Sequence, residues 1–394
     1  MTNVADLKQR AIATIDARRD DLIQISATLH ANPEIAFQEF QAAALLGQTL
    51  EAHGFTVERG AGGLETAFRA EARGSGDGPT IALLAEYDAL PELGHACGHN
   101  IIAASAIGAG IAVQSVLEQL PGRVVVIGTP AEEGGGGKII LLEHGGFAGV
   151  DAAMMVHPSS YTLTTRTSLA SNRLTIEFTG KASHAAAAPD EGVNALQAVI
   201  LTFNNVNALR LHLKPDARVH GIITHGGTVA NIIPDYAAAE FSVRAAQQSY
   251  AQEVLQRVIQ CAEAGGTATG AQLKYTIKPG YAEMLPNPTL ASLFAANWRA
   301  IGVEVQEPRP NERMGSTDMG NVSQALPALH PYIAIAPESV AGHTVEFHAA
   351  SISPAGHEGL LNAAKALAMT TIDLLSSPEL MQQAKQEFAA SKGN

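Results

Sequence analysis

The residues TIALLAEYDALPELGHACGHN, at positions 80–100, combine an apolar run with several chemically reactive side chains. The run Thr80–Tyr87 is typical of a fully buried strand, and a helix rich in small residues is expected to follow the loop. That loop carries Asp88, Cys97 and His99. Open α/β folds bind their ligands beyond the carboxyl ends of the strands, so we expect these side chains at such an edge.

Two further apolar runs downstream end in the same kind of residue. The predicted strand Arg123–Thr129 leads into Glu132 and Glu133, and the predicted strand Ala152–His157 ends in a histidine. Thiolates, imidazoles and carboxylates are metal ligands, and a carboxylate beside a metal can also accept a proton from water. Each stretch alone would fit an ordinary loop. Metal-type side chains at three consecutive strand ends favour a metal site.

The composition limits the class of protein. The chain has 394 residues, which predicts two domains, and 25 − 38 gives a net charge of −13. The positive residues form no cluster of the kind that binds a nucleic-acid backbone. No signal peptide is apparent, and no apolar segment approaches the roughly 18 residues that span a membrane. With only two cysteines there is no disulfide framework, so we expect a cytoplasmic protein in which Cys97 is free.

The order of predicted elements indicates two kinds of architecture. Alternating strands and helices with continuous apolar strands predict an α/β domain with a mixed, largely parallel sheet. Residues 168–280 instead predict the order β-α-β-β-α-β of a ferredoxin-like α+β sandwich. We therefore expect an inserted domain at 168–280, within a domain formed by residues 1–167 and 281–394.

Four other regions complete the expected secondary structure. Residues 5–50 predict two amphipathic helices broken near Asn32–Glu34. The glycine-rich loop Gly74–Gly78 predicts a hairpin between the strands Glu65–Ala72 and Thr80–Tyr87. A strand is expected at Val303–Gln306, and a closing helix at Ala355–Leu375.

Several motifs together resemble a known family. The motifs are AEYDALP (85–91), HACGHN (95–100), PAEEGGG (130–136), SHAA (183–186), GGTVANIIPD (226–235), GSTD (315–318) and HTVEF (343–347). In this order they resemble the aminoacylase/carboxypeptidase-type two-metal amidohydrolases. The branch contains hippurate, indole-acetyl-amino-acid and p-aminobenzoyl-glutamate hydrolases, and ALHPY (328–332) is similar to the last of these. The resemblance covers nearly the whole chain and implies a zinc-peptidase-like catalytic domain.

The resemblance also implies roles for particular residues. Two divalent metal ions would be held by Cys97, His99, Glu133, His157 and His343. Glu132 would be the general base that takes a proton from metal-activated water, and Asp88 would orient a ligating histidine. The inserted domain would be a lid that forms a homodimer, with His184 stabilising the oxyanion in the neighbouring subunit's site. Residues that would contact a carboxylate-bearing substrate are Asn231, Arg244 and Ser316.

One position departs from the family pattern. Many relatives have aspartate where this chain has Glu86, two residues before Asp88. The exact surroundings of the metal site are therefore open at this position. A soft thiolate beside hard carboxylates also leaves the metal open among Zn²⁺, Mn²⁺, Co²⁺ and Ni²⁺, with zinc or manganese expected first.

The expected activity is hydrolysis of the amide bond of an N-acyl or N-aroyl amino acid, or of a dipeptide. Deamination of an aromatic amine at the same two-metal site is an alternative, and a non-catalytic metal-stabilised binding protein is a remote one. A serine hydrolase is excluded because the sequence contains no Gly-x-Ser-x-Gly motif. The sequence does not name the acyl group, the leaving amine or the physiological metal.

Overall fold

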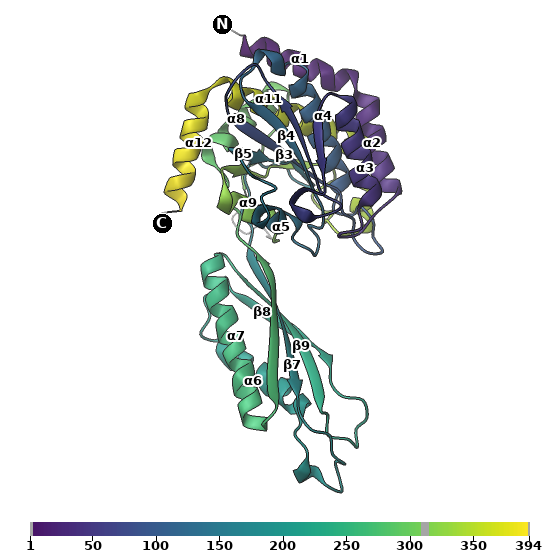
Figure 1. Ribbon diagram of the computed structural model, residues 1–394, viewed down its shortest axis with the longest axis vertical. Coiled ribbons are helices and arrows are strands. Elements are labelled where there is room, and N and C mark those ends of the chain that lie inside the picture. The colour runs from purple at the N-terminus through teal and green to yellow at the C-terminus, as the bar shows by residue number, and fades with distance from the viewer. Residues whose placement is uncertain (1–2, 309–314, 393–394) are drawn as a thin grey trace. The chain divides into compact units, whose positions relative to one another are not determined.

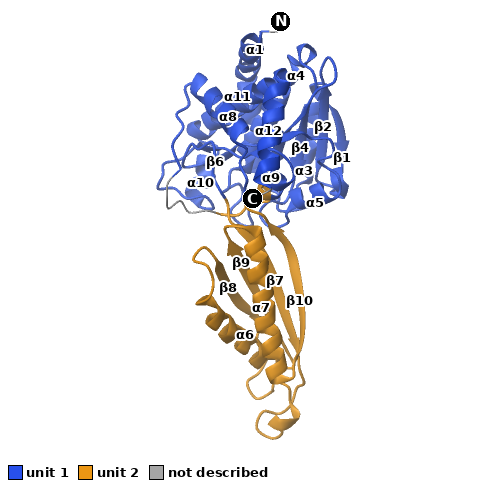
Figure 2. Ribbon diagram, turned by 90° about the vertical axis from the view of Figure 1, so that its left-hand side faces the viewer, with its two compact units in different colours: residues 1–167, 284–313, 321–394 blue, residues 168–283, 314–320 orange. Residues whose placement is uncertain are grey.

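The computed structural model describes residues 3–308 and 315–392. The chain forms two compact units, shown in Figure 2. Unit 1 comprises Met1–Thr167, Met284–Arg313 and Asn321–Asn394, and unit 2 comprises Ser168–Glu283 with Met314–Gly320. The short segment 314–320 joins unit 2 although it lies far along the chain, which the sequence did not indicate.

Unit 1 is built on a six-stranded sheet with the strand order β1-β2-β4-β3-β5-β11. Strand β3 runs parallel to β4 and β5, and β5 runs parallel to β11, whereas β1 and β2 pair in antiparallel fashion at the other side. All seven residues of β3 are buried, as its continuous apolar sequence requires. The predicted α/β architecture with a mixed, largely parallel sheet is confirmed. The strands are β1 Thr56–Arg59, β2 Phe68–Arg73, β3 Thr80–Glu86, β4 Arg123–Thr129, β5 Ala152–Met154 and β11 Ala328–Leu329.

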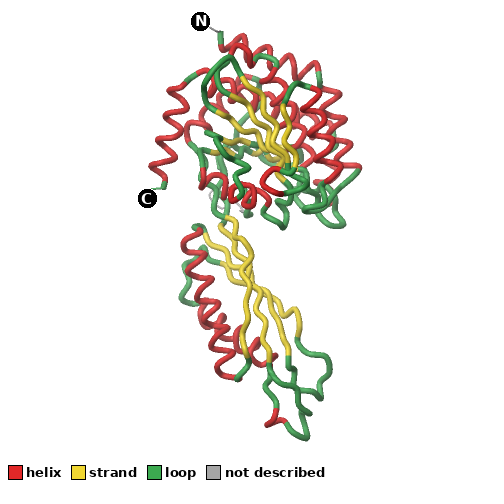
Figure 3. Tube along the Cα trace, in the orientation of Figure 1, coloured by secondary structure: helices red, strands yellow, loops and turns green. Residues whose placement is uncertain are grey.

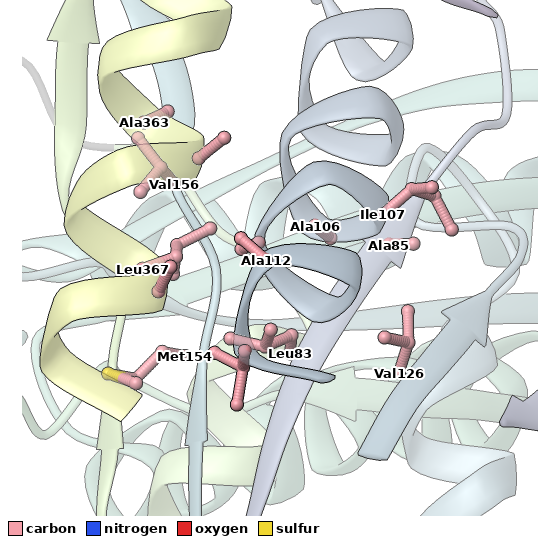
Figure 4. Close-up of a cluster of buried hydrophobic side chains, with 14 of the residues drawn as sticks. Leu83, Ala85, Ala106, Ile107, Ala112, Val126, Met154, Val156, Ala363 and Leu367 are labelled. Carbon is pink, nitrogen blue, oxygen red and sulfur yellow. The ribbon is translucent and has the colours of Figure 1, made fainter. Parts of the chain in front are cut away.

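Helices of unit 1 cover the sheet (Figure 1). The central one, α4 (His99–Gln114), is buried from its first residue to Val113 and consists mostly of alanine, glycine and isoleucine. Its small side chains let it pack between the sheet and α11 (Pro354–Ser376), where Leu83, Ile107 and Leu367 belong to one buried cluster (Figure 4). A fully buried leucine or isoleucine contributes about 2 kcal/mol through removal from water. This packing fixes the loop that precedes α4.

The remaining elements of unit 1 lie around this core. The helices are α1 Val4–Ala17, α2 Arg19–Ala31, α3 Phe40–Ala52, α5 Gly137–Glu143, α8 Pro288–Ala300, α10 Val345–Ala350 and α12 Pro378–Ser391, and α9 spans Met319–Ala325. The strands β6 (His157–Ser159) and β12 (Tyr332–Ala334) form a separate two-stranded parallel sheet. Among the described residues, no helix combines the length and apolar character needed to cross a membrane.

Unit 2 has the predicted β-α-β-β-α-β order and its own core. Its sheet has the antiparallel order β10-β7-β9-β8, and two helices pack on one face of it (Figure 3). Residues of β7 alternate between buried and partly exposed, as expected for a sheet covered on one face. The elements are β7 Ala170–Thr179, α6 Ala195–Arg210, β8 Arg218–His225, β9 Tyr236–Ala245, α7 Gln248–Thr269 and β10 Gln272–Tyr281.

The predicted hairpin around Gly74–Gly78 is wrong. Strands β2 and β3 do not pair, because β4 lies between them in the sheet. The glycine loop instead packs against the turn that precedes β4, where the backbone N–H of Gly74 donates to the carbonyl of Gly122 at 2.9 Å. A Cβ at Gly74 would lie 2.1 Å from the carbonyl oxygen of Leu120, so glycine is required for this close backbone approach.

Three other predicted elements need correction. The predicted pair of N-terminal helices is three helices, since α1 and α2 are separated at Arg18 in addition to the break near Asn32. The strand expected at Ala152–His157 is interrupted, because His157 begins β6 in the other sheet. No strand forms at Val303–Gln306, although Val303 and Val305 pack against the core of unit 1. The alternation of apolar and polar residues here therefore reflects partial burial of the two valines, which pair with no other strand among the described residues.

Candidate metal centre

The residues proposed as metal ligands all belong to unit 1. Strand β3 leads into the loop with Cys97 and His99, β4 leads into Glu132 and Glu133, and His157 begins β6 just after β5. His343 lies in the loop before α10, and its backbone N–H donates to the carbonyl of Ala96 at 2.9 Å. This hydrogen bond joins a late segment of the chain to the Cys97 loop.

His99 is oriented by Asp88. Its Nδ1 lies 2.9 Å from both the backbone carbonyl and the carboxylate Oδ1 of Asp88. Both atoms are acceptors, so Nδ1 carries a proton and Nε2 is the atom that faces the site. The other carboxylate oxygen of Asp88 accepts a hydrogen bond from the backbone N–H of Glu133 at 2.9 Å. Asp88 thus positions parts of two strand-end loops at once.

The electrostatic surroundings of His99 are strongly acidic. Burial lowers the pKa of His99, but Cys97 and Asp88 outweigh that effect and raise the pKa well above its ordinary value. Burial raises the pKa of Asp88, yet the charge of His99 and its hydrogen bond lower it overall. Without a metal, a proton would be retained on the imidazole. A divalent ion would displace that proton on binding.

Cys97 and His157 form a second contact in the site. The sulfur of Cys97 lies 3.5 Å from Nε2 of His157, whose Nδ1 lies 2.7 Å from the backbone carbonyl of Pro158. That carbonyl fixes the ring so that Nε2 faces the sulfur. Burial and then the charge of His99 lower the pKa of His157 to about 4, and burial raises the pKa of the Cys97 thiol. The neutral imidazole has the protonation state that a metal ligand needs.

The carboxylate of Glu133 is shared between two histidines. Its Oε1 lies 3.4 Å from Nε2 of His343 and 3.9 Å from Nε2 of His99. Burial raises the pKa of Glu133, but His343 and His99 lower it overall, and the hydrogen bond to Glu133 raises the pKa of His343. The carboxylate is therefore ionised and faces both rings.

The donor atoms form three overlapping groups in which all atoms lie within 4.8 Å of one another. The groups are Cys97–His99–His157, Cys97–Glu133–His343 and His99–Glu132–Glu133. Buried Nε2 of His99 has no hydrogen-bond partner among the described residues, a costly arrangement unless a ligand satisfies it. The donor set fits divalent metal ions, and the overlap of the groups at Cys97, His99 and Glu133 fits two neighbouring ions.

The charge in this region is also consistent with bound cations. The carboxyl groups of Glu86, Asp88, Glu132 and Glu133 form or adjoin the donor set, and Lys138 adjoins it through Glu86. Buried carboxylates are costly without such compensation.

Two non-glycine residues of the site have strained backbone conformations. Ala131, next to Glu132, has φ of 61°, and His343 has φ of 63°. Such conformations are sparsely populated for residues with a side chain and persist where the surroundings enforce them. The backbone N–H of Ala131 donates to Glu39, and that of His343 donates to the carbonyl of Ala96. These two hydrogen bonds help to hold the strained conformations.

Two supporting contacts were not predicted from the sequence. Glu39 is fully buried and accepts the hydrogen bond from the Ala131 N–H at 2.9 Å, while burial raises its pKa to about 7. Lys138, also fully buried, donates to Oε1 of Glu86. Buried charged residues are rare, but the sequence does not indicate which distant residue each would contact.

The remaining predicted residues belong to unit 2, at opposite ends of its sheet. His184 is exposed, and its Nδ1 accepts hydrogen bonds at 3.2 Å from the N–H groups of Ala186 and Ala187. A neutral ring must then carry its proton on Nε2 as an available donor. Exposed Asn231 is adjacent, since its carbonyl accepts from the N–H of Ala185 at 2.9 Å.

Arg244 and Ser316 lie at the other end of unit 2. Arg244 is half-buried near the end of β9, opposite Ser171, and Gly315 accepts a hydrogen bond from the nearby Leu169. Nε of Arg244 and Oγ of Ser316 are buried without a hydrogen-bond partner in the part of the chain that the structure describes. Strand β9 runs from Tyr236, near the Asn231 end, to Arg244, eight steps of about 3.3 Å or about 26 Å. Arg244 and His184 of one chain are thus far apart.

Comparison with known proteins identifies one family and two curated relatives that match most of this chain. A model of peptidase family M20/M25/M40 matches residues 82–370. The chain is 40% identical over 398 residues to the Xaa-Arg dipeptidase of Mus musculus, covering 97% of this chain and 92% of that protein. It is 31% identical over 449 residues to a p-aminobenzoyl-glutamate hydrolase chain of Escherichia coli (strain K12), covering 95% and 93%.

A solved structure shares the fold. The YXEP protein of Bacillus subtilis, described as a dinuclear metal binding peptidase from the M20 family, superposes with a TM-score of 0.70 at 24% identity. The match covers 91% of this chain and 99% of that one.

Proposed function

Since the chain belongs to peptidase family M20/M25/M40 and is a metal-dependent amidohydrolase, we propose that it cleaves the amide bond of small N-acyl or N-aroyl amino acids or dipeptides. The observation that carries this proposal is the set of three donor groups, which overlap at Cys97, His99 and Glu133 and include Glu132. Cys97, His99, Glu133, His157 and His343 would hold two divalent ions, with zinc or manganese expected first.

The residues of unit 1 supply the acid–base chemistry. When bound, the ions would lower the pKa of a water molecule towards about 7 and polarise the substrate carbonyl. Glu132 lies in one donor group with His99 and Glu133, so its carboxylate can accept the proton of that water. The same carboxyl group then returns the proton to the nitrogen of the leaving amine. Asp88 keeps His99 in the tautomer that leaves Nε2 available.

The substrate class rests on the relatives and on the residues of unit 2. The two curated relatives named above are a dipeptidase and a p-aminobenzoyl-glutamate hydrolase, and both substrates have an amino acid on one side of an amide. The leaving amino acid would carry a carboxylate, and the guanidinium of Arg244, with Nε unpartnered among the described residues, is suited to bind it. Asn231 and Ser316 are the other candidate contacts.

A homodimer would bring the residues of unit 2 to one substrate. Because His184 and Arg244 of one chain lie at opposite ends of the sheet, joint contact with one small substrate requires His184 from a second chain. Strand β8 is an edge strand, and its Ile222 and Ile223 are 64% and 44% exposed. Exposed apolar residues on an unpaired edge favour association with another copy. His184 of the partner would then donate from Nε2 to the oxyanion.

The cytoplasm is the proposed location. Cys97 and Cys261 are free thiols, and the function of Cys97 requires that it stay reduced.

A substrate panel tests the function directly. Metal-free protein would be reloaded with Zn²⁺ or Mn²⁺ and assayed on dipeptides, N-acyl amino acids and aroyl-glutamates, with product identification. We expect release of a free amino acid only after reloading. Ammonia release from an arylamine that contains no amide would instead support a deaminase, and tight metal binding without any turnover would support a binding protein.

A further inference from the structure

A sixth potential donor lies beside the five residues described above. Glu86 is the last residue of β3 and is only 1% exposed. Its Oε2 lies 3.5 Å from Nε2 of His99, the atom that faces the metal centre. Neither this oxygen nor that nitrogen has a hydrogen-bond partner within residues 3–308 and 315–392. A buried carboxylate oxygen and a buried imidazole nitrogen that face one another unpaired are a costly arrangement.

The spacing of these two atoms matches that of ligands on one ion. Metal–nitrogen and metal–oxygen bonds to zinc are about 2.0–2.2 Å long, so two donors at tetrahedral angles lie about 3.4 Å apart. The neighbouring donor pairs have the same spacing, 3.5 Å from Cys97 to His157 and 3.4 Å from Glu133 to His343. A direct hydrogen bond between Glu86 and His99 would normally be shorter, about 2.7–3.0 Å.

Lys138 determines which oxygen of Glu86 faces the site. The ammonium of Lys138, fully buried on α5, binds Oε1 and so holds the carboxylate with Oε2 directed at His99. Lys138 also offsets one negative charge, which limits repulsion among the carboxylates before metal is bound. Lys138 therefore holds Glu86 in an orientation in which Oε2 can bind a metal ion.

We propose that Glu86 is an additional metal ligand, which contributes Oε2 to the ion bound by His99. This inference rests on the proposed two-metal centre and extends it. An added carboxylate would raise the coordination number of that ion and add a hard donor, which favours Mn²⁺ relative to Zn²⁺.

Metal-binding measurements on variants test the proposal without reference to activity. Glu86→Gln keeps the shape of the side chain but removes its charge, and the double variant Glu86→Gln/Lys138→Met also removes the lysine that would lose its partner. We expect the dissociation constant of one of two Mn²⁺ ions, measured by chelator competition, to rise at least about 10-fold in both variants, since a charged donor is lost. The other ion should change less than about 2-fold because its donors are intact.

Asp373→Asn is the matched control. Asp373 forms a partly buried ion pair with Lys8 at 2.6 Å between α11 and α1, and lies outside the donor groups. Its loss should lower stability without changing either dissociation constant. Unchanged Mn²⁺ affinities in a folded Glu86→Gln protein would overturn the inference.

A crystal structure of the Mn²⁺-loaded wild-type protein gives a test that needs no variant. We expect Oε2 of Glu86 within about 2.0–2.4 Å of an ion, the range of direct carboxylate ligands. Two bound ions with Glu86 more than about 3 Å from both would refute the Glu86 ligand and leave the proposed function intact. A wild-type protein that binds no metal would refute the proposed function itself.

Discussion

The two units differ in how their candidate functional residues are arranged. In unit 1 the donor atoms are mostly buried, lie within a few ångströms of one another and are held by further hydrogen bonds. In unit 2, His184 and Asn231 are exposed, and Arg244 lies at the far end of the sheet. Unit 1 thus brings its candidate metal ligands together by itself, whereas in the proposed function the residues of unit 2 would reach one substrate from two different chains. The predictions below test this difference, and they begin with the largest effect.

Loss of the base in unit 1 should have the largest effect. Glu132→Gln removes the proposed general base, so kcat should fall by about 10⁴-fold, the upper range for general acid–base catalysis. Metal content, measured by mass spectrometry, should stay at the wild-type level because the five proposed ligands are unchanged. Activity near the wild-type level in a metal-loaded variant would remove Glu132 from this role.

Loss of the exposed histidine in unit 2 should reduce the rate without reducing stability. His184→Ala removes the proposed oxyanion donor, so kcat should fall by about 10²–10³-fold. The melting temperature should change little because the side chain is exposed and contacts only its own loop among the described residues.

Mixed dimers show whether His184 acts in the partner's site. Equal amounts of Glu132→Gln and His184→Ala chains, unfolded and refolded together, give mixed molecules in half of the dimers. If sites are shared, one site in each mixed dimer is intact, and activity should return to about a quarter of the wild-type value. If each chain used its own His184, no site would be intact and the mixture would stay inactive.

The buried carboxyl group of Glu39 should make the stability of unit 1 depend on pH. Burial raises its pKa from 4.5 to about 7 in the folded protein. A raised folded-state pKa gives stability that is fully present below pH 4.5 and is lost as the pH rises through 7, about 3 kcal/mol for this shift. Urea unfolding of metal-free protein between pH 5 and 8 should show that loss, and Glu39→Gln should abolish most of it. An identical pH dependence in both proteins would show that Glu39 is not the titrating group.

The glycine between Cys97 and His99 should give a smaller effect. Gly98 has φ of 79°, and a Cβ there would lie 2.4 Å from Cγ of Pro158. Gly98→Ala should cost about 2 kcal/mol of unfolding free energy and weaken metal binding, because the collision displaces both neighbouring ligands. Gly63→Ala is the control, since Gly63 has φ of 77° with nothing near its Cβ position among the described residues. Gly63→Ala should lose only the unfolding free energy that a positive φ costs an alanine, and its metal affinity should be unchanged. Equal losses of stability and metal affinity in the two variants would contradict the steric explanation.

The sequence predicted the features that depend on local pattern. Apolar runs marked the buried strands of the sheet, and the positions of Cys97, Glu133 and His157 just after them indicated a common edge. The order of elements in unit 2 followed from periodicity in the same way. The alternation of apolar and polar residues was misleading at Val303 and Val305. These valines are partly buried against the core but have no strand partner in the part of the chain that the structure describes.

Features that depend on the order of strands in space could not be predicted. No local pattern indicates that β4 lies between β2 and β3, so the glycine loop was assigned to a hairpin. The contacts of Glu39 with Ala131 and of Lys138 with Glu86 join residues 92 and 52 positions apart. Each of these contacts can be identified only from the three-dimensional structure, in which the order of the strands is known.

The number of metal ions bound per chain tests the central claim most directly. Native mass spectrometry of the reloaded wild-type protein should find two divalent ions per chain. Cys97→Ala, which removes a donor that belongs to two groups, should weaken the binding of both ions and leave fewer than two bound. A wild-type stoichiometry of one ion, unchanged by Cys97→Ala, would contradict the shared-ligand centre.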